Sequence, residues 1–233
     1  MVFSCQAIGK GRRLPLFTWT FRSFRLTVSA SQTRSQRKPK GEGHARRAEI
    51  LAAAERIFVD HGYEGATIRK IADEVGLSST ALYMHFSEKS QILHEICERA
   101  FEQLLIMNRA VLADAGTPEE RMRRLMQSYV QFGFENPNAY RLVYMTRPQE
   151  AQEAQSAAQS LGGELFGAFV CVVEEAAAQG RLRGEPRATA QALWAGAHGV
   201  VSLIITKPYF DWVEKDLLVD TLLDALFVGL LKP

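Results

Sequence analysis

The chain has 233 residues, of which 47% are hydrophobic and 23% are charged, the composition of a globular protein with room for one or two domains. This balance excludes intrinsic disorder as a description of the whole chain. The formal net charge of +2 combines two unlike parts, because residues 1–41 carry nine Lys or Arg and no Asp or Glu. Residues 42–233 therefore have a net charge of −7, and the sequence predicts a basic arm on an acidic body.

The arm, residues 1–43, sustains neither helical nor strand periodicity, and we expect it to be disordered. Its Arg and Ser content without acidic residues is typical of a transit peptide. We favour the interpretation that translation begins downstream. No Met lies between Met1 and Met84, so such a start would use a Val or Leu codon, and Val28 is well placed. In either case we expect the basic residues at 34–40 to add phosphate contacts.

The three cysteines, Cys5, Cys97 and Cys171, are widely spaced and form no CxxC pair. This pattern indicates neither a disulfide framework nor a metal site, and it favours a reducing, cytoplasmic setting without a cofactor. The longest apolar stretch, residues 192–205, contains His198 and is short of the ~20 residues needed to cross a bilayer. We therefore expect no association with a membrane.

From residue 44 onward the apolar periodicity is helical, which predicts an all-α fold of about nine helices. The first helix should stop at Gly62. Thr67 and Ser78 are the expected N-caps of two short helices, the second ending near Phe86. A fourth and much longer helix should run from about Lys89 to Leu112.

Residues 67–86 have the spacing of a helix-turn-helix motif, in which the second helix enters the major groove of DNA. Ala72 is small enough for the two helices to cross closely, Gly76 permits a turn with positive φ, and Leu82 can anchor the second helix to the core. On spacing alone, an αα-hairpin within a bundle remains the alternative. The short polar and cationic side chains from Ser78 to Lys89 favour DNA.

The run TIRKIADEVGLSSTALYMHFSEKSQIL closely resembles the DNA-binding domain of the TetR family of bacterial transcriptional regulators. The resemblance implies an N-terminal DNA-binding domain of three helices over residues 44–105. His85 and Lys89 would then bind phosphates, Met84 would make only apolar contact, and Leu82 and Phe86 would belong to the core. Together with the polar surface, the resemblance assigns DNA contacts to Thr67, Arg69, Lys70, Ser78, Ser79, Thr80, Tyr83, Met84, His85 and Lys89.

This domain is not basic in bulk, since residues 44–90 hold six Lys or Arg and seven Asp or Glu. Affinity for double-stranded DNA must then come from the placement of cations and helix N-termini, and from duplication in a homodimer. Two recognition helices in a dimer would address the half-sites of a pseudo-palindromic operator.

Residues 106–233 are predicted to form a helical effector-binding and dimerisation bundle, with helices at 118–134, 139–145, a long one ending near 179, 186–206 and 210–231. The phrases LWAGAHGVVSL and PNAYRLVYM resemble the WHG type of TetR C-terminal domain, in which the last two helices form the dimer interface. In the last helix we expect one face to be buried, opposite an acidic stripe of Asp216, Asp220 and Asp224. The predicted buried residues are Leu218, Leu222, Ala225 and Val228.

The intermediate helices are expected to enclose a pocket for a small hydrophobic effector, because their apolar faces carry many aromatic groups and few charges. Ordinary core packing is the alternative for every candidate, and His198 is also readily explained as a hydrogen-bonded packing residue. The candidate lining residues are Leu105, Met126, Tyr129, Tyr140, Tyr144, Phe166, Phe169, Trp194 and His198, with Phe132 and Val170 beside them.

The expected function is that of a ligand-responsive repressor, in which an effector shifts the fourth helix and weakens operator binding. Repression is the more common mode in the family that the sequence resembles, and nothing in these residues excludes an activator of the same family. An enzyme is disfavoured, because the sequence has no Walker A loop and no GxSxG, and the pair His94-Glu95 does not complete HExxH. A non-catalytic helical scaffold would leave the polar cluster from Ser78 to Lys89 unexplained.

Overall fold

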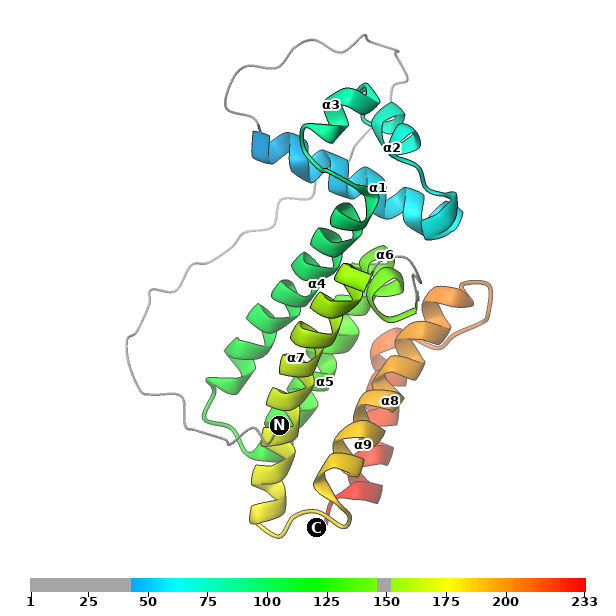
Figure 1. The fold of residues 1–233 in the computed structure, drawn as a ribbon. Helices are drawn as coiled ribbons and strands as arrows, with labels where there is room; N and C mark the ends of the chain where they lie inside the picture. The colour runs from blue at the N-terminus through cyan, green and yellow to red at the C-terminus, as the bar shows by residue number, and fades with distance from the viewer. Residues whose placement is uncertain (1–42, 146–151) are drawn as a thin grey trace. The chain divides into compact units, whose positions relative to one another are not determined.

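The computed structural model describes residues 43–145 and 152–233, and the predictions for the N-terminal arm lie outside the described residues. In this part of the chain every regular element is helical, apart from an isolated bridge between Leu182 and Leu231. The predicted all-α class is confirmed (Figure 1).

Three N-terminal helices share a small apolar core: α1 (Gly43–Gly65), α2 (Ile68–Glu74) and α3 (Ser79–Tyr83). Gly62 has φ 71° inside α1, so the predicted stop at this glycine is a kink that one further turn follows. The core of these helices contains Ile50, Ala54, Phe58, Ile71, Ala72, Leu82 and Phe86.

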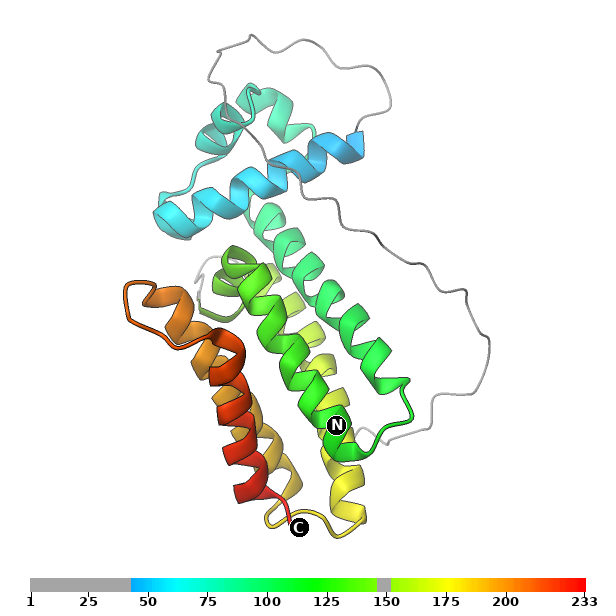
Figure 2. The same ribbon diagram turned by 180° about the vertical axis from the view of Figure 1, so that it is seen from behind.

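The long helix α4 (Lys89–Leu112) connects this N-terminal part to a helical bundle, as both views show (Figures 1 and 2). Ile92 and Ile96 on its first half are buried in the core of α1–α3. Phe101 and Leu104 on its second half are buried in the core of the bundle. One continuous helix therefore contributes to both cores.

The bundle comprises α4, α5 (Pro118–Glu135), α6 (Pro137–Tyr140), α7 (Gln152–Ala178), α8 (Pro186–Thr206) and α9 (Lys215–Leu230). A capping box between Thr117 and Glu120 begins α5, and Gly180, at φ 73°, follows the end of α7. At Gly133 a Cβ atom would lie 2.4 Å from a methyl carbon of Val201, so this glycine is needed for α5 to approach α8.

A π-helical turn, η1 (Arg141–Met145), follows α6 directly and lies between the two cores. Leu142 in this turn is buried in the core of α1–α3, whereas Tyr140 and Tyr144 on either side pack in the bundle core. The segment 137–145 thus contacts both parts of the protein. The sequence predicted a helix here but not its π-helical hydrogen bonding.

The last helix differs from its prediction in both start and orientation. It begins at Lys215 rather than near residue 210. The expected acidic stripe is exposed, and two of its members, Asp220 and Asp224, also form ion pairs with Arg123 of α5. Val219 and Leu223 are the buried residues of this helix, Leu218 and Leu222 are half-buried, and Ala225 and Val228 are exposed. Within a single copy of the chain, the predicted burial is therefore wrong for Ala225 and Val228.

Within the described ranges, α8 is the helix whose length and apolarity would allow it to cross a membrane. In the bundle it packs against α5, α7 and α9, and it buries Leu193, Ala197 and Val201 in the common core. We therefore interpret α8 as a core helix of the bundle.

Candidate functional site

The helix-turn-helix motif is held together by caps that its own sequence supplies. The Thr67 hydroxyl accepts a hydrogen bond of 3.2 Å from the Lys70 N–H at the start of α2, and the Ser78 hydroxyl accepts one of 3.1 Å from the Ala81 N–H at the start of α3. Gly76 between the helices has φ 66°, the left-handed region that favours glycine. Both predicted N-caps and the glycine turn are confirmed.

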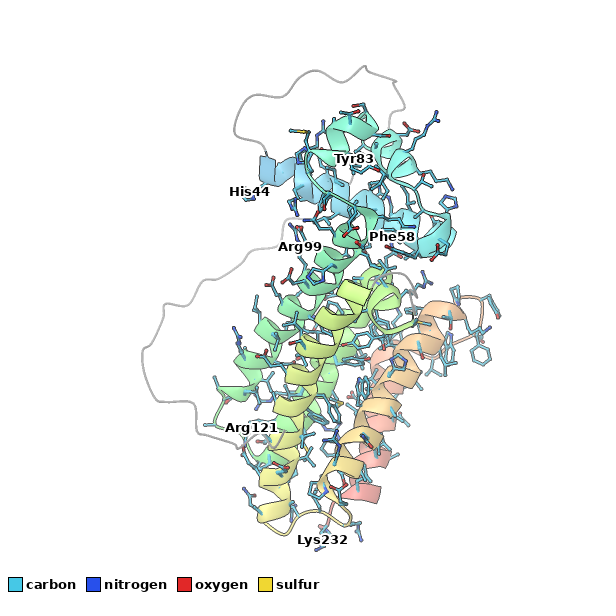
Figure 3. The ribbon with its side chains drawn as sticks, in the orientation of Figure 1. His44, Phe58, Tyr83, Arg99, Arg121 and Lys232 are labelled. Atoms are coloured by element: carbon cyan, nitrogen blue, oxygen red, sulfur yellow. The ribbon has the colours of Figure 1, made fainter. Side chains whose placement is uncertain are left out.

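The second helix of the motif, α3, and the turn after it present different side chains to the core and to solvent. Leu82 and Phe86 are buried, as predicted, whereas Tyr83 is 53% and Met84 is 84% exposed. Tyr83 is labelled beside α3 in Figure 3. Of the ten residues predicted to contact DNA, seven are exposed and three are half-buried: Ser79, His85 and Lys89.

The cationic side chains predicted to bind DNA differ in the contacts that they already make within the protein. Arg69 is exposed and lies 3.8 Å from Asp73. Lys70 Nζ donates to the Gly65 carbonyl at 2.9 Å. Lys89 Nζ donates to the Tyr63 carbonyl at 2.7 Å and lies 4.0 Å from the centre of the Tyr63 ring. An ammonium group has three N–H donors, so Lys89 retains two for a phosphate.

Sequence reasoning missed two adjacent arginines of α1. Arg46 donates to the Val75 carbonyl at the end of α2 at 3.3 Å, and Arg47 donates to the His85 carbonyl just after α3 at 2.5 Å. Arg47 also forms a two-pronged ion pair with Glu95 of α4. Val75, His85 and Glu95 lie 29, 38 and 48 positions along the chain from these arginines, so no local sequence pattern could have revealed these three contacts.

A second cluster of polar groups lies inside the bundle, where α5, α6 and α8 meet. The hydroxyls of Tyr129 and Tyr140 are 2.8 Å apart, and they lie 3.1 and 2.5 Å from His198 Nδ1. Burial raises the pKa of both tyrosines and lowers the pKa of His198. The imidazole is therefore neutral near pH 7, with both tyrosines uncharged beside it.

Aromatic rings surround this triad. The Tyr144 ring lies 4.9 Å from that of Tyr140, and Trp194 lies 6.4 Å from His198 and 5.7 Å from Phe166, measured between ring centres. The structure brings all nine predicted pocket residues to the core of the bundle or directly against it, together with Phe132 and Val170. Phe101 of α4, which the sequence did not single out, also contacts Tyr144 edge-on.

Most predicted pocket residues are buried or half-buried, and Trp194 is 39% exposed at the edge of the cluster. Within the described ranges no group of three or more His, Cys, Asp or Glu side chains is placed to hold a metal ion. What this cluster offers chemically is a set of neutral hydrogen-bonding groups in aromatic surroundings.

Two family models match the chain. Residues 50–96 match the model described as bacterial regulatory proteins, tetR family. Residues 122–226 match the model described as tetracyclin repressor-like, C-terminal domain. The first model covers the helix-turn-helix motif, and the second covers the triad of Tyr129, Tyr140 and His198.

Curated relatives include both activators and repressors. The transcriptional activator FasR of Mycolicibacterium smegmatis is 31% identical over 137 residues, which cover 57% of this chain and 61% of FasR. The repressor KstR2 of Mycobacterium tuberculosis is 28% identical over 109 residues, 47% of this chain and 54% of KstR2. The repressor AcnR of Corynebacterium diphtheriae is 51% identical over 47 residues, 20% of this chain and 25% of AcnR. In each case the chain covers less than two thirds of the relative's length.

Solved structures have the same fold over most of the chain. The ketosteroid transcriptional regulator KstR2 of Mycobacterium tuberculosis has a TM-score of 0.67 at 21% identity, covering 81% of this chain and 96% of that one. The fatty acid degradation regulator FadR of Bacillus halodurans has a TM-score of 0.68 at 18% identity, covering 82% and 98%. At these identities the likeness concerns the fold.

Proposed function

The chain belongs to the tetR family of bacterial regulatory proteins, and from this premise we propose that it is a sequence-specific DNA-binding transcriptional regulator without catalytic activity, acting in the cytoplasm. The observation that carries the proposal is the two-sided α3. In α3 and the turn that follows it, Leu82 and Phe86 are buried, while Tyr83 and Met84 project into solvent next to the polar residues predicted to contact DNA. A helix of this kind can enter a major groove without loss of its own core.

The direct test is selection of bound duplexes from a random DNA pool. We expect recovery of a pseudo-palindromic sequence, because two copies of α3 would read two half-sites. Recovery of no common sequence would overturn the proposal, and recovery of a single unpaired half-site would overturn the dimeric mode of binding.

We assign dimerisation to the outer faces of α8 and α9. These faces expose apolar side chains that find no cover within the described chain, among them Leu203, Leu217 and Val228. Gly196 allows the two helices to approach closely, since a Cβ there would lie 2.8 Å from Leu226 Cδ1. A second copy placed on this surface would complete a four-helix interface and bury the exposed side chains.

The polar triad and its aromatic surroundings are the effector site in this proposal. Neutral hydroxyl and imidazole groups suit a small hydrophobic molecule with an uncharged oxygen, because the triad supplies no cation to balance a buried carboxylate. KstR2 is described as a ketosteroid regulator and FadR as a fatty acid degradation regulator, so a ketosteroid and fatty acyl esters are reasonable first probes.

Binding at the triad can reach the DNA-binding helices by two routes. Tyr140 and Tyr144 flank Leu142, which packs in the core of α1–α3, and α4 extends from the bundle into the same core. A ligand that displaces either tyrosine would bias both routes, typically by a coupling of ~1–3 kcal/mol. The proposed outcome is release from the operator, as for a repressor.

Activation is the second candidate, because FasR is named as an activator. A reporter gene placed behind the selected operator distinguishes the two modes. Higher expression after deletion of the regulator supports repression, and lower expression supports activation.

A further inference from the structure

Arg47 on α1 holds three structural elements with one guanidinium group. Its Nε donates to both carboxylate oxygens of Glu95 at 3.1 and 2.8 Å, and its Nη2 also binds this carboxylate. Its Nη1 donates to the His85 carbonyl at 2.5 Å. The guanidinium carbon lies 4.0 Å from the centre of the Phe86 ring. We call Arg47, His85, Phe86 and Glu95 the Arg47 cluster.

The recognition helix depends on contacts of this kind because it is short. It spans five residues, Ser79–Tyr83, and an isolated helix of that length is unstable in water. Ser78 caps its first turn, and Leu82 anchors it to the core. Just beyond its other end, the Arg47 side chain binds the backbone at His85 and covers the Phe86 ring. The direction of α3 is thus set from both ends.

The other half of the Arg47 cluster belongs to α4. Glu95 also pairs with Arg99, one turn further along α4 and labelled in Figure 3, at 2.7 Å. Burial alone would raise the pKa of Glu95, but the hydrogen bonds and charges of Arg47 and Arg99 lower it below its ordinary value. The pair of Arg47 and Glu95 is only 29% and 17% exposed, so water screens it less than a surface ion pair.

We propose that the Arg47 cluster is a positioning device that fixes the orientation of α3 relative to α4, and that Arg47 thereby determines sequence-specific DNA binding without touching DNA. This inference rests on the proposed DNA-binding function. The planar guanidinium is what allows one side chain to bind the Glu95 carboxylate and the His85 carbonyl at once. A lysine at this position would keep the charge but lacks the planar fork of donors that binds the carboxylate through Nε and Nη2 and the carbonyl through Nη1.

The competing explanation is that Arg47 binds a DNA phosphate directly, and the two explanations predict opposite effects at Glu95. A phosphate-binding arginine would be freed by Glu95→Gln, so DNA affinity would be unchanged or higher. A positioning arginine would lose its fixed geometry, so specific affinity would fall.

The experiment measures binding of the full chain to two duplexes of equal length, one carrying the selected operator and one scrambled, over a series of salt concentrations. The variants are Arg47→Gln, Arg47→Lys, Glu95→Gln and the double variant Arg47→Gln/Glu95→Gln. Arg56→Gln is the matched control, because Arg56 also lies on α1 and forms an ion pair at 3.0 Å, but with Glu74 of α2. Circular dichroism identifies any variant that fails to fold, and Glu95→Gln, which keeps Arg47 intact, is then decisive.

We expect Arg47→Gln, Arg47→Lys and Glu95→Gln each to lower operator affinity roughly tenfold, the scale of one charge-assisted hydrogen bond. Binding to the scrambled duplex and the salt slope should stay unchanged. The double variant should be no worse than Arg47→Gln alone, because the two side chains act as one unit.

Recovery of full affinity by Arg47→Lys, or a loss of ~1 in the salt slope with Arg47→Gln, would identify a phosphate contact and overturn the inference. Operator affinity in Glu95→Gln equal to that of the parent chain would overturn it as well. If the parent chain itself fails to distinguish the two duplexes, the proposed function fails and the inference fails with it.

Discussion

In α3 and the turn after it, some side chains are buried and their neighbours are exposed. Burial decides whether a substitution changes stability or DNA affinity. Leu82 and Phe86 are fully buried, so their replacement acts on folding. Leu82→Ala should lower the free energy of unfolding by ~2–5 kcal/mol, as expected when a buried leucine is removed from a close-packed core. Urea denaturation checks this value, and a loss below ~1 kcal/mol would contradict the assignment of Leu82 to the core.

Tyr83 has the opposite expectation, because its side chain is exposed and can be removed without a cavity. Tyr83→Ala should reduce operator affinity by ~10-fold or more and leave the unfolding midpoint unchanged. Tyr209→Ala is the matched control, since Tyr209 is also strongly exposed but lies beyond the end of α8. Fluorescence anisotropy with the selected operator measures the DNA affinity of both variants. Equal losses in the two variants would remove the basis for placing Tyr83 in the groove.

His198 links stability to pH. Burial lowers its pKa in the folded protein below the ordinary value of 6.5, so the unfolded chain binds a proton more readily than the folded one. Its contribution to stability is therefore present above about pH 6.5 and lost as the pH falls towards the folded pKa. Between pH 7.5 and pH 5.5, the free energy of unfolding should fall less in His198→Gln than in the parent chain. Urea denaturation at the two pH values measures this difference. An identical loss in both proteins would show that His198 does not carry this dependence.

Among the helices, the features that the sequence predicted correctly are those that depend on residues close together in the chain. Thr67 and Ser78 begin their helices because each hydroxyl caps an N–H only three residues away, and such a signal lies wholly within the sequence. The buried face of α9 depends on how this helix packs against α8 and α5, and Arg123 of α5 pairs with Asp220 and Asp224 about a hundred positions away. No periodicity within α9 contains that information, so the face was partly mispredicted. The Arg47 cluster escaped prediction for the same reason.

The exposed face of α9 carries a prediction for the dimer. Val228 is 77% exposed, so Val228→Glu should leave the fold of each copy intact. In a dimer formed through α8 and α9, it would bury an uncompensated carboxylate at a cost of ~3 kcal/mol or more and weaken association at least about a hundredfold. Val213→Glu, at an exposed residue just before α9, is the control. Sedimentation equilibrium that finds the same dimer in both variants would exclude α9 from the interface.

For the molecule as a whole, net charge is a poor guide to DNA binding. The body from residue 42 onward has a net charge of −7, and the nine cations of residues 1–41 offset it. The DNA-binding proposal depends instead on a few placed groups such as Arg69 and Lys70, and on the helix N-termini at Thr67 and Ser78. Fold class and motif could be read from sequence, because the pattern TIRKIADEVGLSSTALYMHF is local. The contacts that connect α1, α3, α4 and η1 could not.

Salt dependence of DNA binding separates the contribution of the arm from that of the motif. Each phosphate neutralised by a cation adds ~0.9 to the slope of log affinity against log salt concentration. The full chain should therefore show a steeper slope than a chain that begins at Gly43, by ~0.9 for every arm cation that contacts DNA, while both select the same operator sequence. Arg69→Gln in the shorter chain should lower the slope by a further ~1 if Arg69 binds a phosphate. Equal slopes for the long and short chains would show that the arm makes no contact with DNA, and that cations beyond residue 42 account for all of the electrostatic binding.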